Sequence, residues 1–450
     1  MKRIFSIALF VVRTVVVTTV FPAEVSLAET KSEYLEIEGY PEPHTPAEHN
    51  KLGAIRYWRE GKQDPIGVVL IPGNGGGAPS LDIVARWLVN NAGAQVWAID
   101  RRANRLEDHR GTEQALTTKN ALAGVMYYMG PDFISVKGTD VPFLQYWGLP
   151  VHLNDVFEVI KEARAHGAKR VFLGGHSLGA MMSQAYAAYE LPDAHPGYED
   201  VDGLILFDGS LWGPHGTEAD IEQRIAEVNK QMDEGQLFPE ALFTAGVASE
   251  LIAIAAVCDP DGQSPIAPLV AELTKIDEPV TNLALFGVSI DTEYAFHRLC
   301  RAGKLAEPDL NTSGKPRTWV RYADVDEVTD ALTLAKSLVT GRGACEWYQP
   351  LALVRDVGVA SNAMLNVPEL GFKYHGQMDK PVIAFLANSS GYRFKRGLEN
   401  YATTVKGEVT IIEIKPDGTY GHLDPIVAAD ADTRVFTPLK QWIEAVLAAE

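Results

Sequence analysis

Residues 175–179 read G-x-S-x-G, and their position in the chain constrains the fold more than any other feature. They follow an apolar run, 171–174, that is typical of a buried strand, and they precede a helix-forming run, 181–189. Glycines two positions before and after Ser177 remove the side chains that would clash in a sharp strand-to-helix turn. The segment therefore predicts a strand, a tight turn that lifts Ser177 clear of the backbone, and a helix.

Further apolar runs of strand length alternate with helical patterns on both sides of this turn. They lie at 66–71, 94–99, 201–207, 381–386 and 409–414. A helix that begins at Ser80, with Gly93 just beyond its end, separates the first two runs. A helix from an Asn154 cap to His166 leads into the strand before Ser177. Continuous apolar runs indicate strands buried on both faces, so we expect a mostly parallel sheet with right-handed crossovers. Two extended stretches, 34–37 and 54–58, predict an opening pair of edge strands.

The alternation stops between Gly213 and Asp379, where the pattern becomes mostly helical. We therefore assign residues 29–212 and 380–450 to an α/β core and residues 213–379 to an inserted helical unit. The mixed stretch 101–150 is interpreted as a smaller insertion that borders the functional site.

The first 28 residues predict a secretory signal peptide. Lys2 and Arg3 precede an apolar run, 4–21, and small residues at 26 and 28 match a cleavage site after Ala28. We expect a secreted or periplasmic protein with no stable membrane insertion after cleavage. A net charge of −19 disfavours nucleic acid or an anionic membrane surface as the main partner. The three cysteines allow one disulfide with one thiol left over, or three free thiols.

A serine hydroxyl is a weak nucleophile at neutral pH and needs a base beside it. His422 is the histidine that follows the last predicted strand, in a glycine-containing loop at 417–425. Functional groups of a parallel sheet gather in loops beyond the carboxyl ends of its strands. Ser177 and His422 are therefore the candidate nucleophile and base.

With these features the chain resembles the α/β-hydrolase superfamily, and in particular its serine hydrolases with a helical cap inserted in the second half of the sheet. The resemblance implies a catalytic acid between the serine and the histidine in sequence. The loop that usually carries the acid reads 387–391 here and contains no carboxylate. Asp208, at the end of the preceding strand, is the position that some lipases of the family use. Asp424, two residues after His422, is the rival, although such an aspartate often begins a helix.

The same resemblance implies donors for the oxyanion that forms when the serine attacks. The backbone N–H of Leu178 follows the nucleophile, and Asn74 and Gly75 stand in a loop similar to the family's H-G-G-G loop, with asparagine in place of histidine. The predicted function is hydrolysis of small or medium carboxylic esters through an acyl-serine, without a cofactor or metal. A peptidase or an acyltransferase would use the same residues, and a binding protein could keep the fold without the chemistry.

A competing interpretation comes from residues 73–78, which match the dinucleotide fingerprint G-x-G-x-x-A, with Asp100 as the ribose-binding acid. It predicts an NAD(P)-binding oxidoreductase. Pro79 disfavours helical geometry at Ala78, and the fingerprint explains neither Ser177 nor His422. As a hydrolase, the protein would use Asp100 to tie down a loop beside the site.

Overall fold

The structure is a computed structural model that describes residues 30–211, 218–294, 299–307, 314–322, 328–363, 365–389, 394–415 and 420–449. The predicted signal peptide, residues 1–28, lies outside the described residues.

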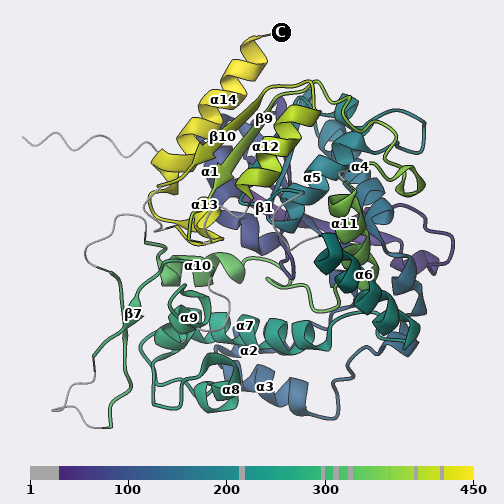
Figure 1. Ribbon diagram of the computed structural model, residues 1–450. Coiled ribbons are helices and arrows are strands. Elements are labelled where there is room, and N and C mark those ends of the chain that lie inside the picture. Colours follow the sequence, from purple (N-terminus) through teal and green to yellow (C-terminus); the bar gives the residue numbers. More distant parts are fainter. Residues whose placement is uncertain are drawn as a thin grey trace, which may run out of the picture.

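An eight-stranded, mostly parallel sheet forms the centre of the molecule (Figure 1), as the alternation of strands and helices predicted. Its spatial order is β1-β2-β4-β3-β5-β6-β9-β10. Only β2 runs against its neighbours, β1 and β4, among the described strands of this sheet. The strands are β1 (Thr30–Glu38), β2 (Lys51–Arg59), β3 (Ile66–Ile71), β4 (Ala94–Asp100), β5 (Arg170–His176), β6 (Gly203–Phe207), β9 (Val382–Leu386) and β10 (Val409–Glu413).

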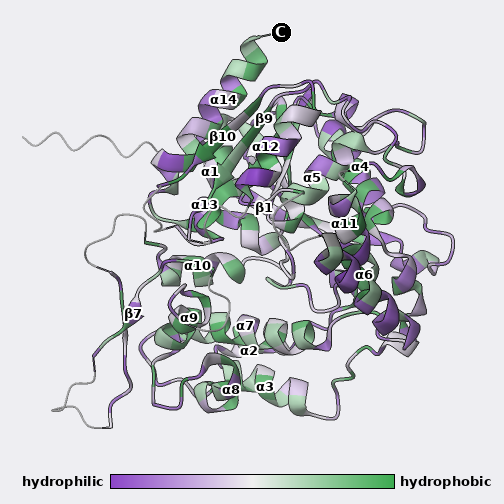
Figure 2. Cartoon of the chain, viewed as in Figure 1, coloured by the Kyte–Doolittle hydropathy of each residue, from purple (hydrophilic) through white to green (hydrophobic). Residues whose placement is uncertain are grey.

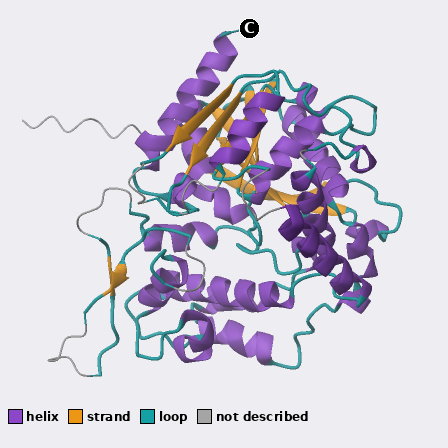
Figure 3. Ribbon diagram, in the orientation of Figure 1, coloured by secondary structure: helices purple, strands orange, loops and turns teal. Residues whose placement is uncertain are grey.

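Helices cover both faces of the sheet (Figure 3), and alternate side chains of each strand pack beneath them. In β3, Val68 and Leu70 belong to the apolar cluster with α1 (Asp82–Ala92) and α14 (Thr437–Ala448). Val69 and Ile71 face the opposite cluster, which contains α4 (Leu149–Ala165), α5 (Leu178–Ala188) and α12 (Lys395–Thr404). Burial on both faces explains the continuous apolar runs in the sequence.

The start of α4 differs from the sequence-based expectation. The helix begins at Leu149, with Pro150 in its first turn, rather than after an Asn154 cap. Asn154 lies inside the helix, where its side-chain amide donates to the carbonyl of Pro150 at 2.9 Å and to the hydroxyl of Tyr189 at 3.1 Å. Proline is well tolerated in a first turn because its missing N–H would have no helical partner there.

A second group of helices, here called the helical layer, lies beyond the carboxyl ends of the strands (Figure 1). Its longest member, α7, is apolar (Figure 2) and has the length and hydropathy of a membrane span, as core helices of globular proteins also do. Here α2, α3, α9 and α10 pack against α7. The layer consists of α2 (Arg110–Thr118), α3 (Ala121–Met129), α7 (Glu240–Cys258), α8 (Ala271–Thr274), α9 (Asn282–Ile290) and α10 (Ala331–Leu338).

Two parts of the chain lie across the boundaries assigned from the sequence. Helices α2 and α3, from the stretch 101–150, join the helical layer. Conversely, α11 (Leu351–Asn362) packs on α4 and α5 of the core and carries α6 (Glu218–Asp233) on its outer side. A two-stranded ribbon of β7 (Lys304–Leu305) and β8 (Trp319–Val320) stands apart from the sheet. The remaining short helix, α13 (Asp424–Val427), follows His422.

Candidate active site

Ser177 occupies the sharp turn between β5 and α5, in a backbone conformation that L-residues rarely adopt. Its φ and ψ are 55° and −114°, and its N–H donates to the carbonyl of Phe207 at 2.9 Å. A Cβ on Gly175 would lie 2.5 Å from the carbonyl oxygen of Ile71, and one on Gly179 would lie 2.0 Å from the same atom. Both glycines of the motif are therefore required by the close approach of β3, and the strained turn holds the serine at the edge of the sheet.

His422 and Asp208 come together beside this turn. Asp208 follows β6, and its Oδ2 lies 2.5 Å from Nδ1 of His422, while its Oδ1 accepts from the N–H of Ala387 at 3.0 Å. The carbonyl oxygen of His422 lies 2.8 Å from Nε2 of His176, the residue before the serine. The imidazole of His422 is thus oriented through its ring by a buried carboxylate, and its backbone is fixed to the turn that carries Ser177.

Asp424 has a different environment. It is fully buried, and its two oxygens accept from the backbone N–H groups of Gly421 (2.6 Å) and Arg301 (2.9 Å) and from the hydroxyl of Thr329 (2.7 Å). Burial raises the pKa of Asp424 to about 7, against an ordinary value of 3.8. These contacts fasten the loop that contains His422 to the segments at 301 and 329.

The candidate oxyanion donors differ in whether their backbone N–H groups already have a hydrogen-bond partner. Leu178 is the first residue of α5, where a backbone N–H has no partner within the helix. The N–H of Gly75 donates to Oε1 of Gln349 at 2.8 Å, and Nε2 of the same glutamine donates to Oδ1 of Asn74 at 2.6 Å. Gly75 was predicted as a possible donor, but its N–H is directed at Gln349 in this structure. The N–H of Asn74 is the candidate that remains in this loop.

Arg101 fixes the 72–77 loop that contains Asn74 and Gly75. Its guanidinium donates to the carbonyls of Pro72 (2.9 Å), Gly73 (2.9 Å) and Gly76 (3.1 Å), and it forms an ion pair with Glu346 at 2.5 Å. Both charged side chains are almost completely buried. The roles of Glu346 and Gln349 were not predicted, since nothing near either residue in the sequence signals a contact with the 72–77 loop.

Asp100, the last residue of β4, is buried and lines neither of the two cavities beside Ser177. Its carboxylate accepts from the hydroxyl of Tyr34 at 2.9 Å and from the N–H of Ala78 at 3.3 Å. Burial raises its pKa to about 6. Asp100 therefore ties the start of the helix after β3 to the edge strand β1, the structural role expected for it in a hydrolase.

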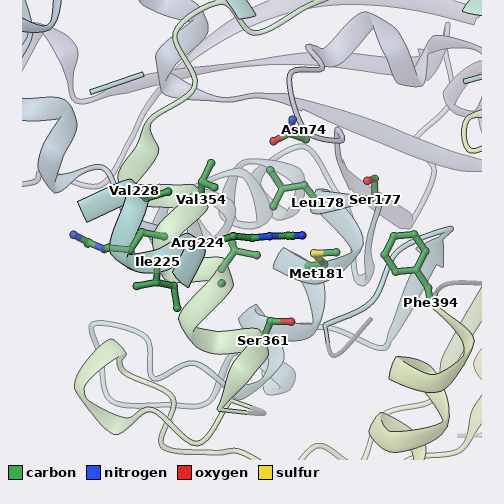
Figure 4. A pocket seen from close by; sticks show the side chains of 13 residues that line it. Asn74, Ser177, Leu178, Met181, Arg224, Ile225, Val228, Val354, Ser361 and Phe394 are labelled. Atoms are coloured by element: carbon green, nitrogen blue, oxygen red, sulfur yellow. The ribbon is translucent and has the colours of Figure 1, made fainter. Parts of the chain in front are cut away.

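Two cavities meet at Ser177. The first, of about 370 Å³, is lined by the serine, by His422 and by the 73–76 loop, and it extends toward α9 and α10. The second, of about 310 Å³, runs between α5, α6 and α11 (Figure 4). Its lining is mainly apolar and includes Leu178, Met181, Ile225, Val228, Val354 and Phe394. Asn74 and Ser177 line both cavities.

Cys258, Cys300 and Cys345 are all free thiols, so of the two arrangements left open by the sequence the structure has no disulfide among these cysteines. Cys345 lines the first cavity, and burial raises the pKa of its thiol well above the ordinary value.

Comparison with known proteins gives one family. A sequence model described as the alpha/beta hydrolase fold matches residues 67–338, well over half of the chain. No curated protein matches the chain significantly.

Similar solved structures include a putative lipase from Sulfolobus solfataricus, with 16% identity, a TM-score of 0.48 and coverage of 92% of this chain and 94% of that chain. An epoxide hydrolase from Mycobacterium thermoresistibile has 15% identity, a TM-score of 0.43 and coverage of 92% and 98%. A monoglyceride lipase from Saccharomyces cerevisiae has 15% identity, a TM-score of 0.43 and coverage of 94% and 97%.

Proposed function

Because the chain belongs to the α/β-hydrolase fold family, we propose that it is a serine hydrolase that cleaves carboxylic esters through an acyl-serine intermediate. The observation that carries this proposal is the pair formed by His422 and Asp208, 2.5 Å apart, in a cavity that Ser177 also lines from a strained turn. An imidazole that is held by a buried carboxylate, in the same cavity as a serine hydroxyl, is the set of groups that can activate a serine.

The proposed reaction has two halves, acylation of Ser177 and hydrolysis of the acyl-serine, and each of these groups acts in both. His422 takes the hydroxyl proton of Ser177 as the serine oxygen attacks the ester carbonyl, while Asp208 holds the N–H at Nδ1 and stabilises the imidazolium. The N–H groups of Leu178 and Asn74 donate to the oxyanion. His422 then protonates the leaving alcohol, and the acyl group stays on the serine. Water then attacks the acyl-serine by the same steps, with His422 as the base, and the carboxylic acid and the free enzyme are released.

The two cavities support an ester with apolar groups on both sides of the scissile bond. One cavity would receive the acyl group and the other the alcohol, since Ser177 lies where they meet. The mostly apolar lining beside α6 and α11 favours a hydrocarbon chain over a charged one. Peptide and acyl-transfer reactions would use the same serine and histidine, so a panel of chromogenic esters, short peptides and alcohol acceptors is the discriminating assay.

The chemistry is tested by labelling with a fluorophosphonate, which reacts with activated serines. We expect stoichiometric labelling of the wild-type protein and none of Ser177→Ala, with unchanged thermal unfolding of the variant. A wild-type protein that folds but is not labelled would contradict the serine mechanism and leave the binding-protein alternative.

We also propose export, on the basis of residues 1–28 alone. N-terminal sequencing of the mature protein from its native host should begin at Glu29. A mature chain that begins at Met1 would contradict cleavage after Ala28.

A further inference from the structure

Three acidic or imidazole side chains form a buried cluster outside the proposed active site. Glu107 and His109 follow β4, and Glu250 lies on α7 of the helical layer. The exposed fractions of the three side chains are 0%, 8% and 6%, respectively. One oxygen or nitrogen atom from each lies within 4.8 Å of the others.

One oxygen of each carboxylate is fixed by a surrounding donor. Oε1 of Glu107 accepts from the N–H of Trp347 at 2.6 Å. Oε1 of Glu250 accepts from the N–H of Cys345 at 3.1 Å and from the indole of Trp347 at 3.3 Å. Donors that fix one carboxylate oxygen in this way orient the other, which is how outer contacts position the ligands of a metal ion.

The remaining atoms point at one another without donors that would satisfy them. Among the described residues, Oε2 of Glu107 and Nδ1 of His109 are buried and have no hydrogen-bond partner. Oε2 of Glu107 lies 3.2 Å from Nε2 of His109, and Oε2 of Glu250 lies 4.0 Å from Nδ1. The two separations involve different nitrogens of the imidazole, of which only one can face a shared ion. With one ligand atom taken from each residue, the three atoms lie within 4.8 Å of one another, so a small movement of the side chains would bring them around one ion at bond lengths of about 2 Å. An ion or a water molecule bound between these side chains would satisfy both buried atoms.

The backbone leaves space beside these atoms. Gly343, at a φ of 51°, approaches so closely that a Cβ there would lie 2.6 Å from Cε1 of His109 and 3.1 Å from Oε2 of Glu107. A cavity of about 30 Å³ is lined by Gly343 and Glu250 on one side of the cluster, and neither Glu107 nor His109 lines it.

We propose that Glu107, His109 and Glu250 bind one divalent transition-metal ion, with Zn²⁺ as the best match to one imidazole and two carboxylates. Such mixed nitrogen and oxygen ligands suit Zn²⁺ and its neighbours rather than Ca²⁺ or Mg²⁺, which prefer oxygen alone. Two carboxylates and a neutral imidazole also balance the charge of a dication. The buried guanidinium groups of Arg101 and Arg102, earlier on the same loop, are already paired with Glu346 and Asp155.

The site joins three parts of the fold, which gives the ion a structural role. It links the loop after β4 to α7, and both to the segment 343–349 that carries Glu346 and Gln349 to the 72–77 loop. No metal ligand was predicted from the sequence, because two of the three residues stand in a short E-x-H pattern and the third, Glu250, lies far along the chain. The inference does not depend on the proposed hydrolase chemistry.

The test is a Zn²⁺ titration of chelator-treated protein, followed by calorimetry and elemental analysis after dialysis. We expect one ion per chain and a rise of a few degrees in the unfolding temperature at a hundredfold excess of Zn²⁺ over Kd. Glu107→Gln and Glu250→Gln should each weaken binding by at least about 10- to 100-fold, which is the loss caused by replacing only an outer contact of a metal ligand. Glu113→Gln, an exposed acid on α2, is the matched control and should bind as the wild type does.

A measurement on the unmodified protein guards against variants that fail to fold. Co²⁺ added in place of Zn²⁺ should give visible ligand-field bands that one equivalent of Zn²⁺ removes. No Zn²⁺ binding by the folded wild type, no Co²⁺ bands, or equal affinity in a folded Glu107→Gln, Glu250→Gln double variant would each overturn the proposal.

Discussion

At the scale of single residues, the turn at Ser177 depends on the absence of side chains at Gly175 and Gly179. The carbonyl of Ile71 occupies the space that a side chain at 175 or 179 would need, so the serine is presented by close backbone packing and not by its own contacts. Asp208, the residue after β6, also has a positive φ, of 40°. Two of the three proposed catalytic residues thus sit on unusual backbone, where strain is maintained by the surrounding sheet.

Replacing Gly179 by alanine should therefore damage both stability and activity. The added Cβ would lie 2.0 Å from the carbonyl oxygen of Ile71, so β3 or α5 has to move. We expect a loss of about 1–3 kcal/mol in the free energy of unfolding and a large fall in fluorophosphonate labelling. Gly358→Ala on α11 is the control for stability alone, since its Cβ meets only Ile225 at 3.5 Å and helix propensity favours alanine, while Gly358 itself lines the second cavity. Denaturant unfolding that ranks the two variants equally would refute this explanation.

The two candidate acids are separated by paired substitutions. Asp208→Asn should lower kcat by roughly 10⁴-fold, because the amide cannot hold the N–H of the proposed base in the required tautomer. Asp424→Asn should retain most of the activity, since Asp424 contacts Gly421, Arg301 and Thr329. Steady-state ester hydrolysis measures both. A collapse in the second variant alone would make Asp424 the acid.

The buried carboxyl of Asp424 also predicts a pH dependence of stability. Its pKa of about 7 in the folded protein exceeds the ordinary 3.8, so the folded state binds the proton more tightly than the unfolded state does. Below about pH 3 the group is protonated in both states. Between about pH 4 and 7 the unfolded chain ionises first, and the free energy of unfolding falls by up to about 4 kcal/mol.

Asp424→Asn, which mimics the protonated acid, should flatten the dependence on pH across that window. Urea unfolding from pH 4 to pH 8 measures it, with the exposed Asp261→Asn as control. Identical slopes for wild type and Asp424→Asn would show that Asp424 does not titrate as its burial implies.

At the scale of elements, the loop after β3 is held by segment 343–349. Besides the side chains of Glu346 and Gln349, backbone bonds join Gly77 to Ala344 at 2.8 Å and Glu346 to Gly75 at 2.9 Å. A loop with four glycines in five positions from 73 to 77 has little conformational preference of its own. Its shape in this structure is imposed by a segment that stands about 270 residues later in the chain.

Gln349→Met should expose this dependence, because it keeps the volume of the side chain and removes both hydrogen bonds to Asn74 and Gly75. We expect kcat to fall about 10- to 100-fold as the proposed oxyanion donor loses its position, with a smaller change in KM. Gln114→Met on the exposed face of α2 is the control. Unchanged kcat in a folded Gln349→Met variant would show that the side chain of Gln349 does not position the proposed oxyanion donor.

At the scale of the whole molecule, two helical regions divide the space around Ser177. The helical layer closes the first cavity, and α6 with α11 encloses the second. Substrate choice should therefore be set by residues outside the sheet, while the chemistry is set by loops at its carboxyl edge.

Val228→Trp should fill part of the second cavity, which the valine lines from α6 (Figure 4). We expect kcat/KM for long-chain esters to fall by at least about 10-fold and that for acetyl or butyryl esters to change little, since about 1–3 kcal/mol is at stake per excluded group. Gln223→Trp, exposed on the same helix, should leave the chain-length profile unchanged. An equal effect on short and long esters would show that the long chain of the substrate does not occupy the second cavity.

The amino-acid sequence by itself determined the elements and the mostly parallel sheet. Apolar runs buried on both faces, and a G-x-S-x-G turn between strand and helix, are local patterns that report directly on local structure. The sequence also identified Ser177 and His422 as the candidate nucleophile and base, because chain order and position after a strand are enough to select them.

Only the tertiary structure decided which polar groups meet. Whether Asp208 or Asp424 faces His422, that Gln349 takes the N–H of Gly75, and that Glu346 pairs with Arg101 all follow from elements packed far apart in sequence. The same holds for the cluster of Glu107, His109 and Glu250. Hydrophobic periodicity specifies which face of an element is buried, but the partner of a buried polar side chain depends on the distances between elements, which no local pattern contains.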